Sequence, residues 1–186
     1  MNIQLTNVIY DVAGERDAQV LAADVGRVPK ANEVIALIKF FACGSNEMND
    51  EEEIRALIAE HFEPMRWGME VEPDWQSFRA DFYPGALLCG AARPAQLRTV
   101  DAFIERMETV ACNNLQTFEE HTRGMKILRF GNIAVVLAMS EMLENGSDVN
   151  HDISGYLLVK SDGRWSIAAH AWDQAGEDKP VPDDLR

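Results

Sequence analysis

Residues 151–173 read HDISGYLLVKSDGRWSIAAHAWD, two strand-like runs joined by Asp162-Gly163. An Asp-Gly pair between two such runs is a strong signal for a tight β-hairpin, because both residues adopt positive φ values at low cost. The sequence therefore predicts two antiparallel strands, His151–Lys160 and Arg164–Asp173.

Two further runs precede this hairpin and have the same character. Leu115–Arg129 and Ile133–Leu143 are separated by Gly131-Asn132, and Asn145-Gly146 leads into the hairpin described above. Glycine and asparagine at these points are typical of tight turns between strands. We expect an antiparallel meander of four strands.

Helical periodicity dominates the region before the meander. Apolar residues recur at helical spacing after Asp50, where Glu53 can close a capping box, and Pro64 is expected to kink or end this helix. A strand, Ala86–Cys89, follows the second predicted helix. The three predicted helices span about Asp50–Met65, Asp74–Asp81 and Leu97–Ala111. Helices followed by hairpins predict an α+β domain whose helices cover one face of a curved antiparallel sheet.

Composition limits the possible partners. The 186 residues carry a net charge of −14, which opposes binding to phosphate backbones and anionic lipid surfaces. We expect no nucleic-acid partner, no membrane and a cytoplasmic location, since the sequence has no signal-like N-terminus and no apolar run long enough to span a bilayer. Three widely spaced cysteines and the absence of a ligand motif predict neither metal nor cofactor.

The chain divides into three predicted parts. Residues 50–175 form the main domain, and residues 1–49 form a helical N-terminal extension of unclear role. Its apolar run, residues 33–43, is expected to pack on the main domain or on a second subunit. Residues 176–186 carry two prolines and six charged side chains, which predicts a surface arm.

Two segments carry a family resemblance. FGNIAVV at residues 130–136 and GYLLVKSDGRWSI at residues 155–167, with the order of elements, resemble the nuclear transport factor 2-like superfamily over about residues 50–175. Ketosteroid isomerases and SnoaL-like polyketide cyclases belong to that superfamily. The resemblance implies a cystatin-like, cone-shaped curved sheet packed on three helices, commonly assembled as a homodimer.

The isomerase chemistry does not carry over. It needs a carboxylate base and two neutral donors around a forming enolate. The matching positions fall on His61, near Gly90 and near Gly155, so none of the three groups is present. The fold resemblance therefore leaves the activity open.

Three histidines are the candidate catalytic residues. His61 projects from an otherwise apolar helical face and occupies the family's pocket position, where an imidazole could act as acid, base or donor. His151 and His170 lie on the last two predicted strands, and the resemblance directs both toward the pocket. The alternative for His61 and His170 is a neutral, hydrogen-bonded core histidine, and for His151 a solvated residue at the rim.

The expected pocket wall follows from strand alternation. In the third strand of the meander we expect His151 and Gly155 to point inward. In the last strand apolarity favours Trp165 and Ile167 as inward residues, whereas the resemblance favours His170 and Trp172, which we follow. The predicted ligand-binding wall consists of Phe82, Phe103, Ala138, Ser140, Met142, Gly155 and Trp172. Its small residues would leave space for a small apolar organic molecule, unless methionine and tryptophan side chains fill it.

These expectations support two hypotheses about function. The first is a SnoaL-like protein that binds a small apolar ligand and, if it is an enzyme, acts as a cofactor-free lyase, isomerase or cyclase through histidine acid–base chemistry. The second is a non-catalytic, dimeric interaction or ligand-carrier module. Its working surface would be the outer face of the sheet together with the apolar N-terminal run.

Overall fold

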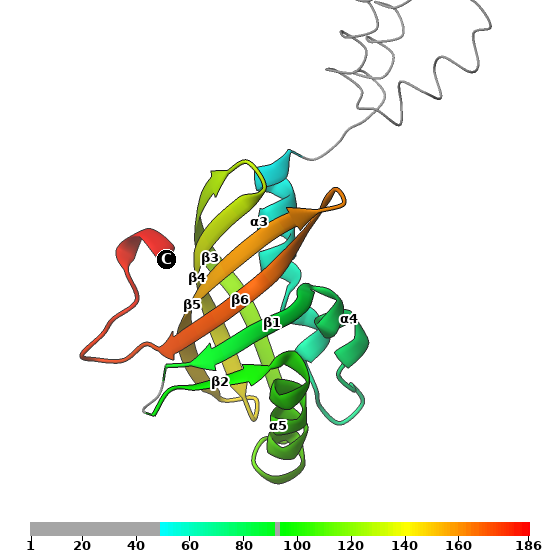
Figure 1. The fold of residues 1–186 in the computed structure, drawn as a ribbon. Coiled ribbons are helices and arrows are strands. Elements are labelled where there is room, and N and C mark those ends of the chain that lie inside the picture. Colours follow the sequence, from blue (N-terminus) through cyan, green and yellow to red (C-terminus); the bar gives the residue numbers. More distant parts are fainter. Residues whose placement is uncertain (1–48, 92–93) are drawn as a thin grey trace, which may run out of the picture. The chain divides into compact units, whose positions relative to one another are not determined.

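A computed structural model describes residues 49–91 and 94–186 (Figure 1). Met48–Arg186 forms one unit of the chain. The predicted extension, up to residue 48, lies outside the described residues, and so does its apolar run.

Six strands form one curved sheet with the order β2-β1-β6-β5-β4-β3 (Figure 1). Neighbouring strands are antiparallel except β1 and β6, which are parallel. The predicted four-strand antiparallel meander is confirmed as β3 to β6, and the predicted α+β fold with a curved sheet is confirmed. The whole sheet is mixed and not purely antiparallel, because β1 joins β6 in parallel. The strands are β1 (Phe82–Gly90), β2 (Gln96–Thr99), β3 (Phe118–Phe130), β4 (Ile133–Glu144), β5 (Asp148–Ser161) and β6 (Arg164–Gln174).

The turns form where the sequence predicts them. Asn145 and Gly146 have φ values of 50° and 71°, and Asp162 and Gly163 have φ values of 52° and 77°. Two consecutive residues at positive φ define the hairpin turns whose twist matches that of antiparallel strands. These local signals set the register of the meander.

The helices differ from the prediction at their ends. The side chain of Asn49, and not that of Asp50, caps the first helix. The Glu52 carboxylate completes the capping box by accepting a hydrogen bond from the backbone N–H group of Asn49. The last helix begins at Val100, because the preceding residues pair with β1 and Thr99 supplies the cap. The helical elements are α3 (Asp50–Glu60), η1 (Glu63–Met65), α4 (Trp75–Ala80), α5 (Val100–Asn113) and η2 (Asp183–Leu185).

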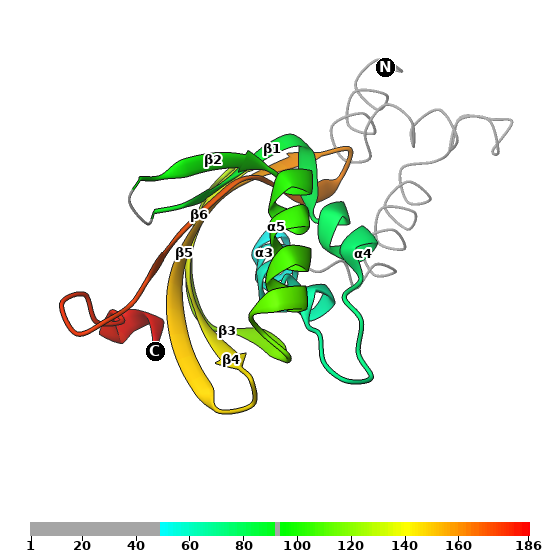
Figure 2. The same cartoon turned by 90° about the horizontal axis from the view of Figure 1, so that it is seen from below.

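The core lies on the concave face of the sheet. Figure 2 shows the sheet curving around α3 and α5. Apolar side chains from α3 pack there against strand residues such as Val136, Leu158 and Ile167, which are fully buried. Among the described residues no helix has the length and hydropathy needed to cross a bilayer.

A bulge in β6 decides which side chains face the core. Leu157 pairs with Ala169 and Leu158 pairs with Ile167, so Ala168 is an extra residue in β6. Such a bulge shifts the alternation of the strand by one position. Before it Trp165 and Ile167 are buried, and after it His170 is buried. Apolarity therefore predicts the inward residues correctly before the bulge, where Trp165 and Ile167 are buried. The family resemblance predicts them correctly after it, where His170 is buried.

The predicted facing of β5 is wrong. Asp152, Ser154, Tyr156 and Leu158 are the buried residues, whereas His151 and Gly155 belong to the opposite, convex face. The register explains this result, because Tyr156 pairs with Val136 and with His170, which both face inward. Both faces of β5 carry apolar residues, so apolarity alone could not separate them.

The C-terminal segment is not a free surface arm. The side chain of Leu185 is buried, and its backbone carbonyl group lies so close to Gly124 that a Cβ atom there would overlap it. Lys126 of β3 forms an ion pair with Asp184. One buried leucine and a close backbone approach therefore hold this charged segment against β3.

Candidate functional site

His61 lies at the centre of the candidate site. It follows the last residue of α3, and its side chain is completely buried. The imidazole centroid lies 4.9 to 5.2 Å from the ring centroids of Phe62, Phe78 and Phe82. Its Nδ1 lies 2.9 Å from Oδ2 of Asp81, the C-cap residue of α4. The ends of two helices therefore bring an imidazole and a carboxylate together in an aromatic environment.

His170 faces His61 from β6, and their ring centroids are 5.9 Å apart. The ring of His170 stacks on Tyr156 with centroids 4.3 Å apart, and its Nε2 lies 3.0 Å from Oγ of Ser154. Burial lowers the pKa of His170 well below its usual value, and the neighbouring His61 lowers it further. His170 is therefore a neutral imidazole at neutral pH. We call this pair of imidazoles with Tyr156 the imidazole site.

Buried polar atoms without a partner mark the imidazole site. Within the described part of the chain, Nε2 of His61, Nδ1 of His170 and the Tyr156 hydroxyl have no hydrogen-bond partner. An unsatisfied buried polar group costs about 1–3 kcal/mol, so native proteins keep such groups few. Burial also raises the pKa of Tyr156, so the hydroxyl retains its proton. Each of these three atoms therefore has hydrogen-bonding capacity that no described residue uses.

His151 does not join the imidazole site. It lies on the convex side of β5, is 38% exposed, and its Nε2 lies 3.5 Å from Oε2 of Glu141. Gly155 lies on the same side of β5. The structure therefore brings together two of the three candidate histidines, His61 and His170.

Most of the predicted ligand-binding wall lies on the concave side. The rings of Phe103 and Trp172 meet edge to face with their centroids 5.7 Å apart, and the ring centroids of Trp172 and His170 are 5.1 Å apart. Five members are buried, namely Phe82, Phe103, Ala138, Ser140 and Met142. Trp172 is partly buried and packs on the core, whereas Gly155 is not part of this wall.

Two buried acids were missed by the sequence analysis. Glu120 and Asp152 lie on β3 and β5. Ser140 of β4 pairs with Asp152, whereas Glu120 pairs with Met142, two residues further along β4. Ser140 donates a hydrogen bond of 2.6 Å to Oε1 of Glu120. Oδ1 of Asp152 is buried and has no partner among the described residues. The alternation of Asp152, Ser154 and Tyr156 contains the signal, but the sequence analysis assigned it to the outer face.

Asp81 was also missed as a partner of His61. It was identified only as the end of a predicted helix, twenty residues from His61 in the sequence. No local pattern connects the two side chains, because their contact depends on how α3 and α4 pack. We know of no sequence signal in this chain that would have revealed the pair.

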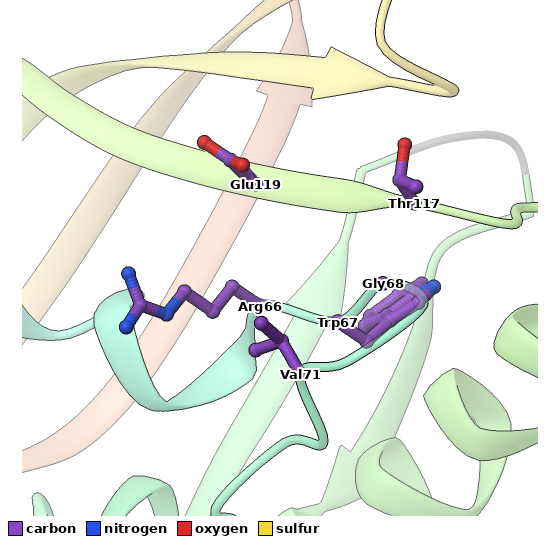
Figure 3. A pocket seen from close by; sticks show the side chains of 6 residues that line it. All are labelled: Arg66, Trp67, Gly68, Val71, Thr117 and Glu119. Atoms are coloured by element: carbon purple, nitrogen blue, oxygen red, sulfur yellow. The ribbon is translucent and has the colours of Figure 1, made fainter.

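A separate pocket of about 210 Å³ lies at the edge of the sheet, beside β3 (Figure 3). The segment from Trp67 to Val71 borders it, and Trp67 is bridged to Phe118 through backbone hydrogen bonds. The residues that line it are Arg66, Trp67, Gly68, Val71, Thr117 and Glu119. It shares no residue with the imidazole site. No group of three or more His, Cys, Asp or Glu side chains among the described residues is arranged to hold a metal ion.

The arrangement of helices and sheet defines the class of fold. Solved structures similar to this chain have nuclear transport factor 2-like or cystatin-like folds, so the resemblance inferred from the sequence is confirmed at the level of the fold. No family model matches the sequence, and no curated protein sequence matches it.

Three similar structures illustrate the range of the fold. A cystatin-like protein of unknown function from Nostoc punctiforme has 13% identity and a TM-score of 0.55, with 69% of this chain and 92% of that chain covered. A candidate scytalone dehydratase from Novosphingobium aromaticivorans has 13% identity and a TM-score of 0.55, covering 72% and 89%. A candidate dehydratase from Streptomyces avermitilis has 10% identity and a TM-score of 0.52, covering 67% and 95%. At such identities the likeness concerns the fold alone.

Proposed function

We propose that the protein binds a small, largely apolar organic molecule against the concave face and moves a proton on it without a cofactor. The reaction class is that of a lyase, isomerase or cyclase. The observation that carries the proposal is the buried pair of imidazoles, His61 and His170, 5.9 Å apart, each with one ring nitrogen that has no partner among the described residues.

His61 is the proposed general base. The Asp81 carboxylate accepts from the Nδ1–H group of His61, which leaves the lone pair of Nε2 free to take a proton. When His61 is protonated, the same carboxylate stabilises the imidazolium. A base held in one tautomer by a carboxylate is a recurrent arrangement for proton transfer.

The proposed donors lie opposite this base. Tyr156 keeps its proton because burial raises its pKa, so its hydroxyl can donate a hydrogen bond to an oxygen that gains negative charge. His170 is neutral and offers Nδ1 to the ligand. Aromatic rings around both histidines provide the apolar surface that a largely apolar ligand needs. The candidate dehydratases with the same fold support this reaction class, since dehydration is a lyase reaction.

Deuterium exchange tests the proposed base without knowledge of the natural substrate. The probe is 2-tetralone, an apolar bicyclic ketone with acidic protons next to its carbonyl, incubated with the protein in D₂O and followed by proton NMR. We expect exchange above the buffer rate, and His61→Gln should lower the protein-dependent rate at least about 100-fold. Asp81→Asn should reduce it less, because the base remains but loses its orientation.

The matched control is His121→Gln, which replaces a partly exposed histidine on β3. This variant should exchange deuterium at the wild-type rate. Equal rates for wild type and His61→Gln would exclude His61 as the base. Circular dichroism of each variant checks that the fold is retained.

A second proposal concerns assembly, and an apolar row on the convex face favours it. Leu128, Val135, Leu157, Ala169 and Leu87 pair in register across five strands. The four larger side chains are 41 to 75% exposed. A continuous apolar row on an exposed sheet face is typical of an interface. We infer that two copies associate through this face, as a dimeric interaction or carrier module would also require.

Light scattering tests the dimer. Leu157→Glu places a charge in the middle of the row and should convert a dimer to a monomer. Met69→Glu is the control, because Met69 is 99% exposed and lies outside the row. A wild-type mass equal to that of one chain would exclude the dimer, and the imidazole site would be unaffected by that result.

A further inference from the structure

The concave face carries a second polar cluster besides the imidazole site. Glu120 and Asp152, which we call the acid pair, lie on β3 and β5 on either side of Ser140. Ser140 pairs directly with Asp152 in the register and donates to Glu120 over 2.6 Å. Tyr156 lies two and four residues beyond Ser154 and Asp152 on the same face of β5, so the acid pair and the imidazole site form one continuous polar stretch.

The acid pair is buried. Glu120 is 7% exposed and Asp152 is 8% exposed. In the part of the chain that the structure describes, no lysine, arginine or histidine forms an ion pair with either carboxyl. Buried charges in proteins are normally paired, because the loss of hydration is otherwise uncompensated. Two buried acids that form no ion pair with a described residue are therefore unusual for a protein interior.

The surrounding charges increase the imbalance. Glu144 from β4 acts electrostatically on both carboxyl groups of the acid pair, and Asp173 from β6 acts on Asp152. Among the described residues, the cation that acts on Asp152 is Lys179, which is ion-paired with Asp173. Burial raises the pKa of Glu120 to about 8, with Asp152 and Glu144 adding to the effect. Burial and the charges of Asp173 and Glu144 raise the pKa of Asp152 to about 6. This region thus favours a positive charge that the described residues do not supply.

The unpartnered atoms define what kind of group would fit. Oδ1 of Asp152 is a buried acceptor without a partner, and the Tyr156 hydroxyl is a second buried group that can accept. An ammonium group offers three N–H donors and one positive charge, so it matches buried acceptors beside two acids in both hydrogen bonding and charge. An alcohol offers a single donor and cancels no charge.

We propose that the acid pair binds the protonated amine of the ligand, while the apolar part of the ligand lies against the imidazole site. This inference rests on the proposed function, because it assumes that the concave face holds the ligand. It narrows the ligand class from a small apolar molecule to an apolar amine. Glu120 and Asp152 become the residues that select for it.

Two probes of matched shape test the proposal. Benzylamine, which is protonated at neutral pH, and benzyl alcohol, which is neutral, are titrated into the full chain and followed by NMR chemical shifts. We expect benzylamine to bind at least about tenfold more tightly. Glu120→Gln and Asp152→Asn should each remove most of this preference, by weakening the binding of benzylamine much more than the binding of benzyl alcohol. Glu141→Gln, on the opposite face of β4 next to Ser140, is the matched control and should retain the preference.

Calorimetry adds a readout that a purely structural role would not produce. Glu120 carries its proton at pH 7 because its pKa is about 8, and an ammonium bound beside it favours the ionised form. Binding of benzylamine should therefore release close to one proton, measured from the dependence of the binding enthalpy on the buffer. Glu120→Gln should abolish this release.

The outcomes separate this inference from the proposed function. Equal affinity for the two probes, or a preference that survives in both acid-pair variants, would overturn the amine inference while the proposed ligand site stands. Binding of neither probe would overturn the amine inference, and wild-type exchange of 2-tetralone would still report on the imidazole site. A preference lost in both acid-pair variants but kept in Glu141→Gln supports the inference.

Discussion

The pKa values of the carboxyl groups near the two ends of β5 are shifted in opposite directions. At one end Lys160 binds Asp50 over 2.7 Å and Glu53 over 2.9 Å, and Trp165 donates a further hydrogen bond to Asp50. The hydrogen bonds from Lys160 and Trp165 lower the pKa of Asp50. Toward the other end Asp152 is buried and forms no ion pair with a described residue, and burial raises its pKa to about 6. Asp152 and Lys160 are only eight positions apart in the same strand.

The contrast separates a region of β5 whose ion pairs stabilise the fold from a region whose buried polar groups destabilise it. At the Lys160 end, charges are matched and α3 is attached to the sheet beside the apolar core. At the Asp152 end, polar groups face one another without partners, at a cost in stability. Proteins retain such costs mainly where function requires them. The three predictions below change one end at a time.

The largest effect is expected for Glu120→Gln. The folded-state pKa of Glu120 is about 8, compared with 4.5 for an ordinary glutamate, so the folded state holds this proton more tightly than the unfolded state. Stability is therefore highest below about pH 4.5 and falls as the pH rises toward 8. Glutamine mimics the protonated acid and should remove this loss, which reaches roughly 5 kcal/mol at most. Urea unfolding at pH 5 and pH 8.5 measures it.

The two proteins should have similar stability at pH 5, and the variant should be the more stable one at pH 8.5. Parallel pH dependence of the two unfolding free energies would contradict the raised pKa. Such a result would also remove the contrast between the ends of β5.

A smaller effect in the same direction is expected for Asp152→Asn. The pKa of Asp152 is raised from 3.8 to about 6, so the wild type should lose stability mainly between pH 4 and pH 6. We expect the variant to be more stable than the wild type at pH 7 by about 2 kcal/mol or less, because the shift is smaller and Lys179 opposes it. Asp148→Asn, an exposed position on the same strand, is the control. A loss of stability in Asp152→Asn at pH 7 would show that the carboxylate has a partner.

The smallest effect is expected for Lys160→Gln, at the matched end. The depressed pKa of Asp50 contributes stability at neutral pH, which is lost as the pH falls through the folded-state pKa of Asp50. Because the ion pairs are partly exposed, Tm at pH 7 should fall by only about 1–3 °C. Thermal unfolding at pH 7 and pH 2.5 checks this, since the difference between variant and wild type should vanish in acid. A larger difference in acid than at pH 7 would refute it.

Much of the fold could be predicted from the sequence because its signals are local. The Asp162-Gly163 and Asn145-Gly146 turns determine where the hairpins fold back, whatever lies around them. Strand β2 was missed, because Leu97–Thr99 also fits the helical pattern of α5 and becomes a strand only by pairing with β1. Local sequence signals are therefore sufficient to predict turns, but they are not sufficient to predict an edge strand.

The candidate site was less predictable because it depends on the register between strands. His61 and His170 were identified by residue type and by the family resemblance, and both lie on the concave side. The facing of β5 was not predicted, and this error hid Asp152 and Tyr156. A shift of one residue exchanges the two faces of a strand, and partner strands decide the register.

The bulge at Ala168 allows both halves of β6 to contribute side chains to the interior. Deleting Ala168 would remove the bulge but leave Tyr156 paired with His170, so the later residues would keep their facing. If Ala168 were instead kept and paired as an ordinary strand residue, every later residue would move by one position, and Ala169 and Ala171 would replace His170 and Trp172 in the interior. The second interior imidazole therefore depends on where the strand absorbs one surplus residue, and not on which side chain that residue carries.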